Sequence, residues 1–182
     1  MSDESIESDP EDKILLNLEL SDREHNSIGR IVSLWGAIEH EIFFQTLDSL
    51  NDSGGLPKDM NNLQSSKVME LWKSHVIDRV DIEQRKILQD QYVLMKQFSK
   101  LRNAIVHGMW EWSMKNPDRV DVFMVRKGNI DRFNFTVEDL EHFALALARI
   151  NYRIRYPRGF EDRATDLEQS GSYISRSYLR KK

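Results

Sequence analysis

The residues best suited to chemistry lie in one short segment, Leu101-Arg102-Asn103-Ala104-Ile105-Val106-His107-Gly108. A histidine transfers protons near neutral pH, and an arginine stabilises the negative charge that develops on a phosphorus centre. An RNA phosphodiester carries its own nucleophile, the 2′-hydroxyl, so its cleavage needs little more than these two groups. Asn103 and His107 are one helical turn apart, so they share a face and can orient each other or a phosphate. The segment indicates phosphodiester chemistry, with Arg102, Asn103 and His107 as candidate catalytic residues.

Several other kinds of site are excluded by residue type or by spacing. The chain contains no cysteine, which excludes disulfides, thiolate nucleophiles and cysteine-ligated zinc. Neither a glycine-rich phosphate loop nor a nucleophile elbow occurs in the sequence. The histidines do not repeat at the spacing of a zinc site, and only one segment, Asp139-Leu140-Glu141-His142, approaches a di-iron motif. We therefore expect neither a metal ion nor a cofactor.

The segment from Arg102 to His107 resembles the signature of the HEPN superfamily. That signature is an arginine, usually followed by a polar residue, with a histidine four to six residues further on, and four residues separate Arg102 from His107. Leu101, Gly108 and the pattern from Trp35 to Glu39 are similar to the context of this motif in HEPN proteins, and the resemblance covers roughly residues 21–108. It implies a helical bundle and a metal-independent ribonuclease that leaves a 2′,3′-cyclic phosphate. It also implies a homodimer with two motifs across a shared cleft, acting on RNA as a toxin or a stress or phage-defence effector, with an antitoxin or regulatory protein as a possible partner.

A purely structural role is the alternative for each motif residue taken singly. A histidine at a helix C-terminus interacts favourably with the helix dipole, and an arginine can serve as an ion-pair partner. The alternative for the whole chain is a catalytically inactive HEPN-like module that dimerises or binds a partner protein or nucleic acid.

Arg102 and Glu39 each interrupt an apolar stripe on a predicted helix. The residues seven and four positions before and three and four positions after each of them are all apolar. Because an isolated charge in such a setting is strongly disfavoured, we expect Glu39 and Arg102 to form a buried, hydrogen-bonded ion pair between the first and third helices.

Basic residues near the motif could attract a polyanion. Lys96 and Lys100 fall on the same side of the predicted helix as Asn103 and His107, which makes them candidate RNA-binding residues. Residues 149–156 alternate bases with aromatic residues and could also contact phosphates, although a solvated helix face is the commoner explanation.

Four helices are predicted, and the motif lies at the end of the third. Ser21 and Glu24 form a capping box that begins a helix ending near Leu50, and a loop rich in Gly and Asn follows. A shorter helix is expected over 66–77. Asp81 caps a third helix that reaches His107, with Gly108 in the usual position of a helix-ending glycine. Thr136 caps a fourth, over 137–156, with an apolar stripe that contains Leu140, Phe143, Ala144, Leu147 and Ile154.

Alternation with a period of two predicts strands between the third and last long helices. Trp110, Trp112 and Met114 share one face, residues 116–119 form a turn around Pro117, and strands follow over 120–126 and 130–135. A weaker alternation occurs over 14–20. The predicted fold is therefore α+β and mainly α, a HEPN-like helical bundle with a small three-stranded antiparallel meander. The predicted single domain covers residues 21–157 with the meander at 108–135, between an acidic, disordered leader at 1–20 and a polar, loose tail at 158–182 with a basic end.

Composition is typical of a water-soluble globular protein, with 40% hydrophobic and 31% charged residues among 182. The net charge of -4 does not by itself indicate a nucleic-acid partner, so RNA would have to bind at a local basic site. The acidic N-terminus lacks the features of a secretory signal, and the longest apolar run is too short to cross a bilayer. These features predict a cytoplasmic protein without membrane association.

Overall fold

The computed structural model describes residues 19–51 and 65–170 of the chain. The elements are α2 (Asp22–Asn51), α3 (Ser65–His75), the short 3₁₀ helix η2 (Ile77–Arg79), α4 (Ile82–His107), β1 (Met109–Ser113), β2 (Asn116–Arg126), β3 (Asn129–Phe135), α5 (Val137–Arg155) and α6 (Phe160–Ser170). The fold is thus α+β and mainly α, with a three-stranded antiparallel sheet between the third and last long helices, as the sequence predicts.

The long helices begin where their capping residues predict. The Ser21 backbone N–H donates to the Glu24 carboxylate over 2.7 Å, while the Glu24 N–H donates to the Ser21 hydroxyl over 3.3 Å. Asp81 accepts hydrogen bonds from the first backbone N–H groups of α4. Thr136 and Asp139 form a reciprocal capping box at the start of α5. Each cap satisfies N–H groups that have no partner within the helix, which fixes where the helix starts.

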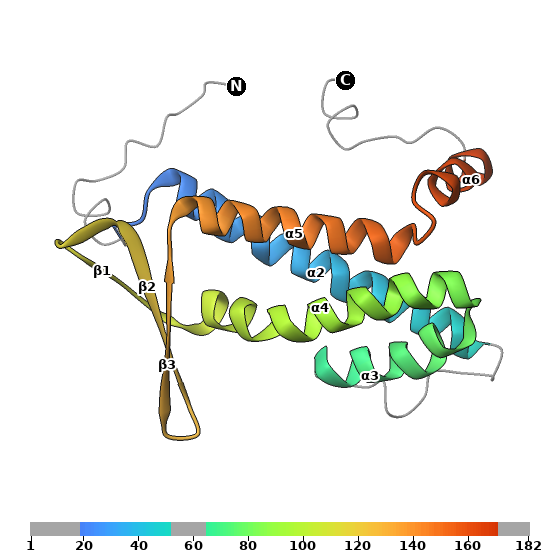
Figure 1. The fold of residues 1–182 in the computed structure, drawn as a ribbon, viewed down its shortest axis with the longest axis horizontal. Helices are drawn as coiled ribbons and strands as arrows, with labels where there is room; N and C mark the ends of the chain where they lie inside the picture. Colours follow the sequence, from blue (N-terminus) through green and yellow to red (C-terminus); the bar gives the residue numbers. More distant parts are fainter. Residues whose placement is uncertain (1–18, 52–64, 171–182) are drawn as a thin grey trace, which may run out of the picture.

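The helices pack around one connected apolar core. Figure 1 shows α2 and α5 side by side, with α4 beneath them and α3 against the second half of α2. The predicted stripe of α5 is buried throughout, and β2 and β3 contribute to the same core. The core residues with almost no solvent exposure include Ile31, Trp35, Ile38, Ile42, Trp72, Met95, Ile105, Val122, Leu140, Leu147 and Ile154.

The sheet has the order β1-β2-β3 and lies at the end of the bundle where α4 finishes and α5 begins (Figure 1). Trp110 pairs with Val122, and Val122 pairs with Phe133, so these three side chains share the face that contacts the core. The β2–β3 hairpin turns at Lys127 and Gly128, which both have positive φ angles, 49° and 79°. Two such residues are typical of the tight hairpin turn that matches the twist of the strands.

Gly108 follows the last residue of α4, as predicted, and joins the helix directly to the sheet. The reason for a glycine at this position differs from the predicted one. Its backbone is extended, with φ -77°, so it is not the left-handed residue that commonly ends helices. A Cβ atom here would lie 2.3 Å from Val122 Cγ1 and 2.4 Å from the Ala104 carbonyl oxygen. Glycine is required because β2 crosses so closely over the end of α4. The Trp110 indole N–H donates to the Ile105 carbonyl over 3.2 Å and secures the same junction.

Two sequence predictions about local structure are wrong. Residues 116–119 belong to β2, and the chain reverses earlier, at Met114 and Lys115. Pro117 is accommodated because β3 pairs with β2 only from Val120 onward, so Pro117 interrupts no ladder on that side. Residues 160–170 form α6 instead of a loose tail. Its first turn carries acidic residues, and the Asp162 carboxylate accepts from the Arg158 backbone N–H and side chain, both at 2.7 Å.

The described residues do not include positions 1–18 of the predicted leader at 1–20, the loop over 52–64 or the basic end at 171–182. Most of the weak strand signal at 14–20 also lies outside the described residues, and Glu19 and Leu20 are not in a strand. In the part of the chain that the structure describes, none of the helices has the length and apolar character needed to span a membrane.

Candidate functional site

The site begins with Arg102, which points from α4 toward α2. Its guanidinium carbon lies 5.6 Å from the centre of the Trp35 ring, and its Nη1 donates to the Asn103 side-chain oxygen over 2.9 Å. The Arg102 Nε atom is buried, and it has no hydrogen-bond partner among the described residues. Arg102 is therefore held by a ring face and a neighbouring amide, with donor capacity left over.

The predicted contact between Arg102 and Glu39 exists in a looser form than expected. Arg102 Nη2 lies 3.9 Å from Glu39 Oε2, which is beyond hydrogen-bonding distance, and the two side chains are 22% and 32% exposed. The predicted ion pair between the two helices exists, but the prediction that it is buried and hydrogen-bonded is wrong. The reason is that Glu39 has another partner, because Trp35 Nε1 donates to Glu39 Oε1 over 2.7 Å. A buried indole N–H thus directs the carboxylate away from the arginine.

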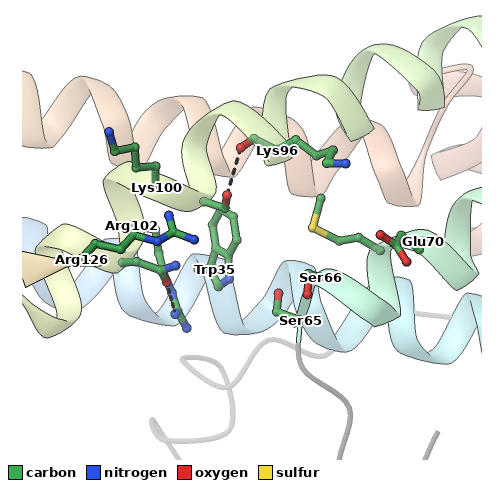
Figure 2. Close-up of a pocket in the computed structure, with 11 residues that line it drawn as sticks. Trp35, Ser65, Ser66, Glu70, Lys96, Lys100, Arg102 and Arg126 are labelled. Atoms are coloured by element: carbon green, nitrogen blue, oxygen red, sulfur yellow. Dashed lines mark hydrogen bonds between the residues drawn. The ribbon is translucent and has the colours of Figure 1, made fainter. Parts of the chain in front are cut away.

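Arg102 and Asn103 line a pocket of about 360 Å³ between α2, α3, α4 and the end of β2. Figure 2 shows Lys96 and Lys100 coming from α4, Ser65, Ser66 and Glu70 from α3, and Arg126 extending in from β2. The remaining lining residues are Trp35, Met69 and Ser99. The structure thus brings together four of the residues that the sequence singles out, namely Arg102, Asn103, Lys96 and Lys100.

Positive charge dominates the pocket lining, which has four cationic side chains and one carboxylate, that of Glu70. Two of the cations have a carboxylate group close to them. Lys100 Nζ lies 3.2 Å from Asp131 Oδ2, and Arg102 has the looser contact with Glu39. Lys96 lies over the Tyr92 ring at 5.4 Å, and neither Lys96 nor Arg126 forms an ion pair with any other described residue. The electrostatic character of the site is that of an anion-binding pocket.

His107 is exposed at the end of α4 and does not line this pocket. His107 is five positions after Arg102 on the helix, and at about 100° per residue the two side chains leave the helix about 140° apart. The structure therefore places Arg102 and Asn103 in one pocket and His107 outside it within a single chain. Among the residues that the structure describes, no group of three or more acidic or histidine side chains could hold a metal ion.

Sequence reasoning missed the pocket residues that come from other elements. Ser65 and Ser66 start α3, and Arg126 ends β2, so neither has a periodic relation to the motif on α4. The only signal for Arg126 was its position as a base beside the hairpin turn at 127–128. No sequence spacing could show that this hairpin lies against α4.

The carboxyl groups with lowered pKa values serve the scaffold. Hydrogen bonds from Arg132 and Asn134, on the outer face of the sheet, hold the pKa of Asp121 below its ordinary value, and burial opposes them. The backbone N–H of Thr136 does the same for the pKa of Asp139 at the cap of α5. Both groups stabilise elements that flank the pocket without lining it.

The fold and the site together define a mainly helical α+β protein with a cationic pocket beside an exposed histidine. No protein-family model, no curated protein and no solved structure matches this chain.

Proposed function

We propose that this protein is a HEPN-type, metal-independent endoribonuclease in which Arg102, Asn103 and His107 act on the RNA phosphodiester. The observation that supports the proposal best is the position of Arg102 and Asn103 in a cationic pocket, five and four residues before an exposed histidine on the same helix. A purely structural arginine would need no anion-binding surroundings, whereas an arginine that binds phosphate does.

In this mechanism the His107 imidazole accepts the proton of the 2′-hydroxyl, and the 2′-oxygen attacks the adjacent phosphorus. The bond from phosphorus to the 5′-oxygen breaks, and that oxygen takes up a proton from an imidazolium or from water. The products are a 2′,3′-cyclic phosphate and a 5′-hydroxyl. The Arg102 guanidinium stabilises the charge on the phosphoryl oxygens, and the Asn103 amide, which accepts a hydrogen bond from Arg102, orients it.

The proposal includes a homodimer. Because Arg102 and His107 diverge around α4, one copy alone does not surround a phosphate with both groups, and a second motif across a shared cleft would supply the missing group. Light scattering at micromolar concentration should give twice the mass of the chain. A monomeric mass under conditions in which RNA is cleaved would refute this part of the proposal.

The decisive experiment incubates purified protein with total RNA in the presence of EDTA. Cleavage should yield cyclic-phosphate ends, and His107→Ala and Arg102→Ala should each abolish it while the circular dichroism spectrum stays unchanged. His142→Ala on α5 and Arg30→Ala on α2 are matched controls, because both residues are exposed and do not line the pocket. Cleavage that survives both motif substitutions would show that the chemistry resides elsewhere.

A second candidate function is a catalytically inactive HEPN-like module that dimerises or binds a protein or nucleic acid. The exclusion of His107 from the pocket favours it. Binding of RNA without cyclic-phosphate products would support this alternative. A role as a toxin or as a stress or phage-defence effector, with an antitoxin or regulatory protein as partner, belongs to the same proposal and rests on the resemblance of the motif.

A further inference from the structure

The two cations of the pocket that have no carboxylate partner among the described residues come from different parts of the fold. Lys96 lies on α4, seven residues before Asn103, and Arg126 is the last residue of β2. Lys100 forms a partly exposed ion pair with Asp131 of β3 and also lies 5.7 Å from the centre of the Phe133 ring, so β3 contacts α4 here. Arg126 enters the pocket from the same sheet (Figure 2).

Hydroxyl groups complete the lining opposite these cations. Ser65 and Ser66 stand in the first turn of α3, which carries no acidic residue, and Ser99 lies on α4 between Lys96 and Lys100, where its hydroxyl donates to the Lys96 carbonyl over 2.9 Å. Hydroxyl donors and unpaired cations around one cavity suit phosphate oxygens, which accept several hydrogen bonds at once. The aromatic ring of Trp35 is almost completely buried, so it offers no exposed face on which a base could stack.

We propose that the part of this pocket around Lys96 and Arg126 is a subsite for one backbone phosphate of single-stranded RNA, adjacent to the cleaved phosphate that Arg102 contacts, with Lys96 and Arg126 as its principal ligands. The inference rests on the proposed function, because it assigns the RNA strand a path from the pocket along α4 to His107. Because the subsite contacts only a phosphate, its affinity for RNA should not depend on the identity of the bases. Arg126 and Lys96 determine how tightly RNA is held, and they take no part in the transfer of protons.

The test measures RNA binding in a His107→Ala background, in which the strand stays intact. A fluorescent single-stranded RNA of randomised sequence is titrated with Arg126→Ala or Lys96→Ala protein at several salt concentrations. The controls are Arg30→Ala on α2 and Lys86→Ala on α4, which remove one exposed positive charge each, away from the pocket. Arg126→Gln and Lys96→Gln provide second versions that keep a polar side chain.

Each pocket substitution should weaken binding by about fivefold, since one charge contact near 4 Å in water is worth about 1 kcal/mol. Each should also reduce the slope of log K against log salt by about 0.7, the share of one phosphate contact in a single strand. Control variants should keep the affinity and the slope of the His107→Ala protein. With His107 present, Arg126→Ala should raise KM and leave kcat unchanged.

The outcomes separate this inference from the proposed function. If cleavage depends on His107 and Arg102 but the pocket variants bind RNA like the controls, the subsite does not exist and the ribonuclease proposal stands. If the pocket variants lose affinity but no cleavage occurs, the subsite is real and the ribonuclease proposal fails. Absence of any RNA binding would refute both.

Discussion

Replacing Glu39 tests how the contact between Trp35, Glu39 and Arg102 is organised. Glu39→Gln removes the negative charge beside Arg102 but keeps an oxygen that can accept from the Trp35 indole N–H. Glu39→Ala removes both. The two variants therefore separate the ion pair from the hydrogen bond. In the wild type, one carboxylate oxygen of Glu39 accepts the hydrogen bond from Trp35, and the other faces Arg102 in the ion pair.

The geometry predicts that the hydrogen bond between Trp35 and Glu39 contributes more to folding stability than the ion pair between Glu39 and Arg102 does. The ion pair spans 3.9 Å with both side chains partly exposed, so its contribution is about 0 to 1 kcal/mol after solvent screening. The Trp35 residue is only 1% exposed, and a buried donor left without an acceptor costs about 1 to 3 kcal/mol. Glu39→Ala should thus destabilise the protein by about 2 kcal/mol and Glu39→Gln by less than about 1 kcal/mol. The first value corresponds to a fall of about 4 to 8 °C in Tm.

Thermal unfolding followed by circular dichroism measures the difference, and a double-mutant cycle with Trp35→Phe identifies its source. Phenylalanine keeps most of the buried ring but lacks the N–H, so adding Glu39→Ala to Trp35→Phe should cost much less than Glu39→Ala alone. Glu138→Gln, at an exposed ion pair with Arg23, is the control and should melt like the wild type. Equal losses for Glu39→Gln and Glu39→Ala would refute the reasoning and show that the charge on Arg102 dominates.

Two further predictions concern the elements around the pocket. Gly108→Ala should destabilise the protein by about 1 to 3 kcal/mol in urea unfolding, because its Cβ would overlap Val122. The control is Gly36→Ala on α2, which has open space around its Cβ and should not destabilise the protein. Equal stability of the two variants would contradict the close crossing of β2 over α4. Asp121 has a folded-state pKa below its ordinary 3.8, so its contribution to folding stability is present above that pH and is lost as the pH falls through the lower folded pKa. Asp121→Asn should therefore flatten the pH dependence of Tm in this acidic range. A slope equal to that of the wild type would contradict this prediction.

Local features of the fold could be predicted from the sequence because each depends on neighbours along the chain. The caps at Ser21, Asp81 and Thr136 need only side chains within three residues of the helix start. The apolar stripe of α5 likewise follows from its period. The wrong predictions share one cause, which is competition with distant residues. Pro117 could enter a strand only because β3 is absent beside it, and Glu39 turned from Arg102 because Trp35 offered a buried donor.

The candidate site could be predicted only in the part that one helix contributes. The spacing on α4 identified Arg102, Asn103, Lys96 and Lys100, and all four line the pocket, but helical geometry also carries His107 away from it. No pattern within α4 could have revealed Arg126. Its place in the pocket follows from the close crossing of β2 over α4 at Gly108, with the contact between Lys100 and Asp131 beside it.

These two contacts explain why the sheet belongs to the site although it lies outside the recognisable motif. The chain leaves α4 at His107 and enters β1 without a linker, and Gly108 lets β2 cross directly over the last turn of the helix. The β2–β3 hairpin crosses α4 near the end of the helix (Figure 1), where Asp131 reaches Lys100 and Arg126 reaches the pocket. We expect a longer connection or a side chain at position 108 to shift β2 and with it Arg126, one of the two pocket cations without a carboxylate partner in the described part of the chain. The position of the sheet in the chain is thus what gives the pocket its excess of positive charge.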